Sequence, residues 1–271
     1  MRGLKLALLA NMLVMGLMVA TSGAATPTCS LVTGGTKTVT TTISVPGNYC
    51  LSTKLTYTPS TGDAIAITAD NVTLDLSGYN VVNSSAGARS GVYASDKSFI
   101  IVKNGTIDGF NDGVLLTKDS VATTGHIIEN LHILNSSNEG IEMECTGGVI
   151  RNNVIISSGA YGIMPGGPGN RILNNEIIDS GDTGIWANGN NSHYAIIEGN
   201  KISNTNTMGT QGIRVCSSYM LVINNRITNM DTGITFSNAG SGSGKFRDNI
   251  TSGCTVSYAV SPPWVDAGNN Q

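Results

Sequence analysis

A glycine followed by a β-branched residue returns along the chain at nearly constant spacing. The pattern occurs as Gly-Val or Gly-Ile at Gly91, Gly113, Gly140, Gly162, Gly184, Gly212 and Gly233. The steps between these glycines are 22, 27, 22, 22, 28 and 21 residues. A unit of about 22 residues is too short for a strand, a packed helix and two turns, but it accommodates two or three short strands joined by tight bends. The spacing predicts a repeat whose coils stack by parallel strand pairing.

A pair of asparagines before an isoleucine keeps the same period. The pairs are Asn152-Asn153, Asn174-Asn175 and Asn224-Asn225. Asn tolerates the left-handed backbone region, and its amide can bond to an Asn one coil away, whereas glycine permits bends that a Cβ atom would oppose. One inward residue per strand fills a shared column. We therefore expect two buried columns, one of Ile133, Ile155, Ile177, Ile202 and Ile227 and one of Ile141, Ile163, Ile185, Ile213 and Ile234.

These repeats, with the stretch Asn71 to Tyr79 and the segment Lys103 to Ile107, resemble the right-handed parallel β-helix of the pectin-lyase-like superfamily. The resemblance extends over roughly residues 60 to 255, and it implies an all-β, single-stranded solenoid of about 8 to 10 coils with a β cap at its N-terminus. The superfamily includes lyases, hydrolases, epimerases, tailspikes and proteins with no known reaction. The resemblance therefore indicates a fold rather than an activity.

The first 25 residues have the pattern of a secretory signal peptide. Arg2 and Lys5 precede an apolar run from Leu6 to Val19, and small residues follow at Ser22 to Ala25. This pattern predicts a secreted protein, extracellular or periplasmic, without a membrane span after the signal is removed; a membrane anchor is the alternative. Removal of the segment leaves 13 basic residues against 18 acidic ones, a net charge of −5.

The rest of the chain divides into three parts. We expect an N-terminal cap over residues 26–60, the repeats over residues 61–251 and a C-terminal cap over residues 252–271, because the open end of a solenoid is a strand edge that must be covered. In the last part Pro262-Pro263 cannot donate to a ladder, and Trp264 is available to cover the last coil.

The cysteine spacing predicts one disulfide. Cys29 and Cys50 lie about one coil apart and are expected to pair in the N-terminal cap. Cys145 and Cys216 lie three coils apart, roughly 14 Å, which is too far to bridge. Charged residues make up only 12% of the sequence, and they form no basic cluster. The sequence therefore predicts no nucleic-acid partner. The lack of a His/Cys cluster predicts no zinc site, and Ca²⁺ is the cofactor left open.

Strand alternation predicts two outward columns of different character. The column after the Gly-Ile dipeptide contains Tyr93, Leu115, Glu142, Met164, Trp186, Arg214 and Thr235. The column before the isoleucine of the Asn turn contains Thr106, His132, Val154, Glu176, Lys201 and Arg226. The second column ends in an alternating charge ladder, which is typical of a solvated face.

The first column has the composition of a sugar site. Apolar ring faces stack on aromatic side chains, and sugar hydroxyls need donors and acceptors. The long repeats place insertions at residues 118–125, 188–194 and 205–211, and insertions in solenoids often mark the binding face. We expect a polysaccharide along this column, between the first two insertions; covering of the apolar groups by the loops is the alternative. The predicted substrate-binding residues are Tyr93, Lys118, Trp186, Asn188 and Tyr194.

Two chemistries are compatible with this column. Glu142 and Glu144 point to one face about 6 to 7 Å apart, and could share acid and base roles in glycoside hydrolysis, bind a cation, or be simply solvated. Arg214 and His193, with Lys118 and Tyr194, could instead supply a base and a cation for elimination from a uronic-acid polymer, although the net charge opposes a polyanion.

The sequence departs from the catalytic motifs of the enzymes of the superfamily. It lacks the Asn-Thr-Asp, Asp-Asp, Gly-His-Gly and Arg-Ile-Lys series of polygalacturonases, the Asp-Pro-His-Asp of mannuronan epimerases and the Arg-x-Pro-x-x-Arg of pectate lyases. No catalytic residue of these enzyme families can therefore be assigned to a position of this sequence. The hypothesis is a secreted polysaccharide-binding β-helix, acting as a lyase or a glycoside hydrolase with the lyase slightly ahead. A non-enzymatic surface, fibre or scaffold solenoid is the alternative.

Overall fold

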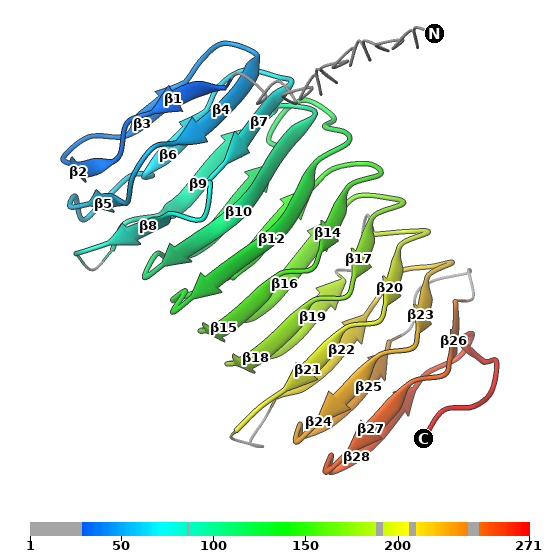
Figure 1. Cartoon of the computed structure of the whole chain (residues 1–271). Helices are drawn as coiled ribbons and strands as arrows, with labels where there is room; N and C mark the ends of the chain where they lie inside the picture. The colour runs from blue at the N-terminus through cyan, green and yellow to red at the C-terminus, as the bar shows by residue number, and fades with distance from the viewer. Residues whose placement is uncertain (1–28, 86, 188–191, 206–209, 238–243) are drawn as a thin grey trace, which may run out of the picture.

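The described residues form an elongated stack of coils, in which successive coils follow one another along the chain from Ser30 to Asp266 (Figure 1). The structure is a computed structural model that describes residues 29–85, 87–187, 192–205, 210–237 and 244–271. A typical coil contains three short strands, one on each of three faces, and the described residues contain no helix. The predicted signal peptide lies outside the described residues. The all-β solenoid expected from the repeat is confirmed.

The strands of the three faces are as follows. The first face contains β1 (Ser30–Val32), β4 (Gly47–Leu51), β7 (Val72–Asp75), β14 (Val149–Arg151), β17 (Arg171–Leu173), β20 (Ile196–Glu198), β23 (Leu221–Ile223), β26 (Lys245–Arg247) and β29 (Val265–Asp266). The second face contains β2 (Gly35–Lys37), β5 (Leu55–Tyr57), β8 (Asn80–Asn83), β15 (Val154–Ser158), β18 (Glu176–Ser180), β21 (Lys201–Ser203), β24 (Arg226–Thr228) and β27 (Ile250–Ser252). The long strands β10 (Ile100–Asp108) and β12 (Ile127–Leu134) continue from the first face into the second. The third face is a ten-stranded sheet of β3 (Thr41–Ile43), β6 (Ile65–Ile67), β9 (Ser90–Ser95), β11 (Asp112–Thr117), β13 (Ile141–Glu144), β16 (Tyr161–Gly166), β19 (Thr183–Ala187), β22 (Gln211–Val215), β25 (Thr232–Phe236) and β28 (Val256–Val260).

Three corners join the faces, and each uses a residue with left-handed backbone. In one coil the chain leaves the third face at Gly147 (φ 66°), enters the second face at Asn152 (φ 55°) and turns back to the third face at Ser157 (φ 61°). We call these the first, second and third corners. A left-handed residue at each corner turns the chain sharply enough to close a coil of about 22 residues.

The glycine of the repeated dipeptide serves packing and not the bend. A Cβ atom on Gly162 would lie 2.5 Å from Cγ2 of Ile177 and 2.6 Å from the carbonyl oxygen of Gly184. The other glycines of the repeated dipeptide meet an isoleucine of the second face in the same way, except Gly233, which meets Thr251. None of these glycines has positive φ. The expectation that this glycine permits a bend is therefore wrong. A side chain does not fit at this glycine because a methyl group of the second face occupies the space.

The two asparagines of each pair have different roles at the second corner. The first adopts the left-handed conformation, with φ between 53° and 55° at Asn152, Asn174 and Asn224. The second is buried, and its amide donates to the side-chain oxygen of the next asparagine along the solenoid. This ladder runs through Asn153, Asn175, Asn200, Asn225, Asn249 and Asn270, with donor to acceptor distances of 3.0 to 3.1 Å. The predicted Asn contact between coils is confirmed.

Replacing Asn200 by Ala is expected to lower the free energy of unfolding by about 2 to 4 kcal/mol, because several buried groups lose their partners together. Asn200 donates to the Ile172 carbonyl and to Asn225, and it accepts from the backbone and side-chain amides of Asn175. Urea denaturation measures the change. The control is Asn224→Gly, where glycine keeps the left-handed conformation and the change is expected to stay within about 0.5 kcal/mol. Equal losses in the two variants would contradict the role of the ladder.

The core consists of the two predicted isoleucine columns and their neighbours. All ten isoleucines of these columns are at most 2% exposed. They pair in register from coil to coil, as Ile155 with Ile177 on the second face and Ile163 with Ile185 on the third. The two columns are confirmed, and they hold the third face in a fixed register.

The end segments contribute strands to the same stack. Strands β1 to β5 pair in parallel with the strands of the following coils, and β28 and β29 pair in parallel with β25 and β26. Trp264 is 7% exposed, and its ring centroid lies 4.7 Å from that of Phe236. The predicted disulfide between Cys29 and Cys50 is present, and Cys145, Cys216 and Cys254 are free. Within the described parts of the chain, none of the segments forms a helix with the length and apolar character needed to cross a membrane.

Candidate functional site

The third face presents the outward column predicted from the repeat. Register pairs align Tyr93, Leu115 and Glu142 on adjacent strands, and further along they align Trp186 with Arg214. These side chains are half-buried except Leu115, which is only 4% exposed. The expectation that Leu115 belongs to an exposed apolar surface is wrong, because the larger Tyr93 and Glu142 flank it on both neighbouring strands.

A second row of side chains accompanies this column, immediately before the glycine of each dipeptide. The ring of Tyr161, in this row, lies 4.5 Å from the ring of Trp186, in the outward column of the next coil. The two rows therefore meet on one face. The sequence analysis did not predict this row because it counted strand alternation only from the isoleucine onward. The residue before each repeated glycine recurs at the same spacing, and this recurrence could have revealed the row. The row contains Ser90, Asp112, Glu139, Tyr161, Thr183, Gln211 and Thr232.

Two carboxyl groups of the second row lie side by side and are buried. Asp112 and Glu139 are 4% and 6% exposed. Asp112 accepts hydrogen bonds from the side-chain amides of Asn111 (3.2 Å) and Asn138 (3.1 Å) and from the backbone N–H of Glu139 (3.3 Å). Burial, followed by the hydrogen bond with Asp112 and its charge, raises the pKa of Glu139 to about 8. Glu139 therefore keeps its proton at neutral pH.

Glu142 is the more accessible acid of this cluster. Burial, and then the negative charges of Glu144 and Asp112, raise the pKa of Glu142 to about 7, against the opposing effect of Arg89. A carboxyl group that titrates near neutral pH in a partly accessible position has the property required of a general acid or base. Asp63, on an earlier coil, also has a raised pKa because of burial.

Glu144 is held by the first insertion. Its side-chain oxygen Oε2 accepts a hydrogen bond from the backbone N–H of Lys118 (3.3 Å). The following residues are fixed by Asp96, whose Oδ1 accepts from three consecutive backbone N–H groups at 2.8 to 3.0 Å, and these bonds lower the pKa of Asp96. The insertion at residues 118–125 is therefore an ordered loop at the first corner, beside the acidic end of the third face.

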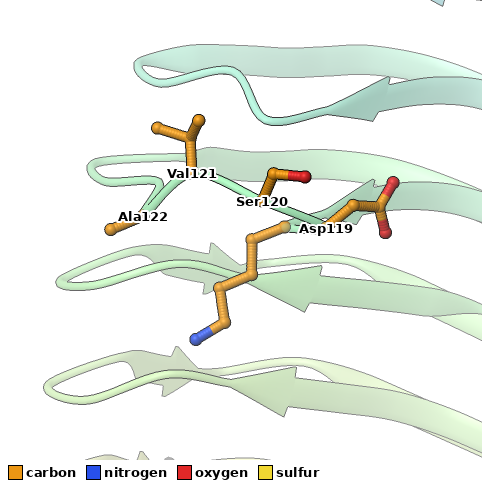
Figure 2. A pocket seen from close by; sticks show the side chains of 5 residues that line it. Asp119, Ser120, Val121 and Ala122 are labelled. Atoms are coloured by element: carbon orange, nitrogen blue, oxygen red, sulfur yellow. The ribbon is translucent and has the colours of Figure 1, made fainter.

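This loop encloses a hollow of about 250 Å³ lined by residues 118–122. Figure 2 shows that the side chains of Asp119 and Val121 leave the loop in different directions. Because polar groups do not converge on the hollow, it is not a site for chemistry by itself. Lys118 borders it and lies next to Glu144 through the backbone contact already described.

The C-terminal half of the face is aromatic and cationic. Trp186 contacts Tyr161 on one side, and the guanidinium carbon of Arg214 lies 5.8 Å from the centroid of the Trp186 ring on the other. Burial raises the pKa of Tyr161, so its hydroxyl remains a donor at neutral pH. At the acidic end, Arg89 lies over the ring of Tyr93 at 4.4 Å. The face thus combines stacking surfaces with donors and acceptors.

The remaining candidates lie at the first corner or outside the described residues. His193 accepts a hydrogen bond at Nδ1 from the backbone N–H of Ser218 (3.2 Å), so this nitrogen supports the corner. Tyr194 lies beside His193 and is 62% exposed. Asn188 lies outside the described residues. The structure brings Glu142, Glu144, Tyr93, Trp186 and Arg214 to one face, and it places His193 and Tyr194 at that face's edge.

The second face has a different surface. Glu176, Lys201 and Arg226 are exposed and in register, as the predicted charge ladder requires, and they border a hollow of about 240 Å³ with Ser203 and Thr228. Among the residues that the structure describes, no group of three or more His, Cys, Asp or Glu side chains is arranged to hold a metal ion.

Comparison with known proteins identifies the architecture. The family model described as right handed beta helix region matches residues 112–261, more than half of the chain. No curated protein is significantly similar in sequence.

Solved structures with the same architecture include carbohydrate-active enzymes. Pectate lyase Pel9A gives a TM-score of 0.55 at 16% identity, covering 89% of this chain and 70% of that one. The catalytic domain of GH87 alpha-1,3-glucanase in complex with nigerose gives 0.51 at 14% identity, covering 90% of this chain and 64% of that one. A variant of that domain in complex with tetrasaccharides gives 0.54 at 13% identity, covering 89% and 64%. At these identities the similarity shows the fold, and the chain spans about 64% of the glucanase domain.

Proposed function

Because the chain belongs to the right-handed β-helix family, we propose that it is a carbohydrate-active β-helix whose third face binds a polysaccharide. The observation that carries the proposal is the composition of this face. Glu142 with a pKa of about 7 lies on the same sheet as the adjacent rings of Tyr161 and Trp186 and the cation of Arg214. Aromatic rings bind the apolar faces of sugars, and charged side chains beside them bind the sugar hydroxyls and supply the groups for catalysis.

The charge of the face favours a neutral polysaccharide. Four carboxyl groups, those of Asp63, Asp112, Glu142 and Glu144, accompany two guanidinium groups, those of Arg89 and Arg214, and a fifth carboxyl group, that of Glu139, keeps its proton at neutral pH. A uronic-acid polymer would meet repulsion from the acidic end, whereas hydrolysis of a neutral glycoside needs a pair of carboxyl groups. We therefore place glycoside hydrolysis ahead of elimination, which reverses the order suggested by the sequence.

In the proposed reaction Glu142 is the general acid. Its proton passes to the glycosidic oxygen as the bond from that oxygen to the anomeric carbon breaks, and water adds to the anomeric carbon. Glu144, on the same side of β13, takes the proton of the water or stabilises the positive charge. Burial, and then the negative charges of Glu144 and Asp112, raise the pKa of Glu142, and Arg89 limits the rise.

Two further observations support the proposal. The structural neighbours are named as an alpha-1,3-glucanase and a pectate lyase. The disulfide between Cys29 and Cys50 is typical of an oxidising compartment, which agrees with the predicted signal peptide and with secretion to an extracellular or periplasmic location.

Trp186→Ala is expected to weaken binding of the polysaccharide by about tenfold, because the sugar loses a stacking surface worth about 1 kcal/mol or more. Purified protein is screened against neutral glucans and uronic-acid polymers by affinity electrophoresis, and reducing ends and unsaturated products are measured in parallel. Reducing ends without unsaturated products indicate hydrolysis.

The matched control is Tyr79→Ala, which removes a ring that is 40% exposed near the second corner, away from the third face. It is expected to leave binding unchanged. A parent protein that binds none of these polymers would overturn the proposal and favour the scaffold alternative.

A further inference from the structure

Aromatic residues occupy left-handed positions at the first corner. Successive coils are joined there by backbone hydrogen bonds from Gly125 to Thr146, Gly147 to Pro168, Gly169 to His193 and Tyr194 to Ser218. The donor residue in each bond has positive φ. The corner column along the solenoid reads Asn71, Phe99, Gly125, Gly147, Gly169, Tyr194 and Tyr219.

Tyr194 and Tyr219 adopt a conformation that glycine would adopt without strain. Their φ values are 61° and 59°, and side chains as large as tyrosine are rarely found there. The three preceding coils use glycine at the same position. A bulky residue held in a strained conformation calls for a compensating role, and such residues cluster at functional sites.

Burial of the rings does not supply the compensation. The side chains are 62% and 50% exposed, and the rings stack on one another with centroids 5.2 Å apart and planes within 7°. Phe99 has φ 58° and is 51% exposed, but its ring covers Gly125 of the next coil, where an added Cβ would lie 2.8 Å from Cδ1 of the ring. The ring of Phe99 thus packs on the next coil, whereas the two rings of the tyrosine stack (Tyr194 and Tyr219) pack on one another.

The outer ring face of Tyr194 looks along the column toward residues without side chains. Because Tyr219 covers one face of the ring, the other face is directed to the coils of Gly169 and Gly147. A Cβ on Gly147 would meet nothing within 4 Å, and one on Gly169 would meet only the backbone nitrogen of Gly147 at 3.9 Å. His193 approaches the Tyr194 ring edge-on, at 6.4 Å between centroids. Within the part of the chain that the structure describes, the outer face therefore has open space in front of it.

The tyrosine stack also continues the aromatic half of the third face. Tyr194 lies on the corner that follows β19, which carries Trp186, and Tyr219 on the corner that follows β22, which carries Arg214. We propose that the tyrosine stack is a second sugar-binding subsite, where a neutral sugar ring packs on the outer face of Tyr194 above Gly169 and Gly147. This inference rests on the proposed function, and it extends the bound chain from Trp186 around the first corner.

The test uses the glycine variant, because glycine removes the ring and relieves the backbone at once. Tyr194→Gly is expected to unfold at the same or a higher urea concentration than the parent. Its affinity for α-1,3-glucan oligosaccharides of two to eight units, or for the neutral glucan that the screen identifies, is expected to fall about three- to tenfold. The loss is confined to oligosaccharides long enough to reach both Trp186 and the corner.

Phe99→Gly is the matched control, since it removes an aromatic ring from the same backbone conformation at a place with a packing role. It is expected to lose stability and keep its affinity. Unchanged binding by Tyr194→Gly, with weakened binding by Trp186→Ala, would overturn the subsite and leave the proposed function standing. A Tyr194→Gly variant that unfolds more readily than the parent would show a structural role for the ring and would also overturn the subsite. A parent that binds no glucan would overturn both.

Discussion

Ile177→Asp is expected to abolish folding of the solenoid. Ile177 has no exposed surface and pairs in register with Ile155 and Ile202 on the two neighbouring coils. Its Cγ2 also fills the space beneath Gly162, where a Cβ would lie only 2.5 Å away. An unpaired carboxylate at this position has aliphatic neighbours on every side, and the cost exceeds about 4 to 5 kcal/mol, a large share of the stability of a typical domain.

The measurement is circular dichroism together with the yield of soluble protein. Ile177→Val, which removes one methylene, is expected to fold and lose about 1 kcal/mol. Leu221→Asp introduces the same charge at a strand position that is 38% exposed, and it is expected to fold. A folded Ile177→Asp variant with near-parent stability would contradict the packing of the isoleucine column.

The fold was predictable because its determinants are periodic in sequence. Parallel stacking places equivalent residues one above another, so that Ile155, Ile177 and Ile202 recur at the spacing of the coils and are buried together. The cysteine spacing likewise matched one coil, and Cys29 and Cys50 are paired. The period of the sequence shows which residues occupy equivalent positions in successive coils. Apolar residues at equivalent positions stack in one column and are buried together.

The physical role of a repeated residue was less predictable than its position. Gly162 recurs because Ile177 and the Gly184 carbonyl leave no room for a Cβ, although a bend was expected. Asn200 extends the asparagine ladder without an asparagine before it, because Gly199 supplies the left-handed residue at that corner. Both facts depend on contacts between coils, which a one-dimensional pattern does not contain.

The candidate site was predictable in part for the same reason. Alternation placed Glu142, Trp186 and Arg214 on one face, but it did not place Asp112, Glu139 or Tyr161 there. The strand begins at a corner, so the residues before the glycine do not follow the alternation counted from the isoleucine. The strained tyrosines of the first corner were equally hidden, since the sequence does not record φ.

Glu142→Gln is expected to lower the rate of polysaccharide hydrolysis by about 10²- to 10⁴-fold, because glutamine cannot donate a proton to the leaving oxygen. The substitution is nearly isosteric, so the fold and the binding surface are retained. Glu176→Gln on the second face is the matched control and is expected to leave the rate unchanged. A Glu142→Gln variant that hydrolyses the polymer like the parent would exclude this carboxyl group as the acid.

The pH dependence separates a catalytic role from a structural one. If Glu142 donates the proton, the activity of the parent falls as the pH rises above about 7, where this group loses its proton.

The stability of the protein also depends on the pH over this range. The pKa of Glu142 is higher in the folded protein than in the unfolded chain, so the folded state binds more protons between pH 4.5 and about 7. Its contribution to stability is therefore full below pH 4.5 and is lost as the pH rises to 7. The Gln variant is expected to lack this decline in urea denaturation, and to gain stability relative to the parent at pH 8. A parent whose activity instead rises through pH 7 would assign Glu142 the role of base.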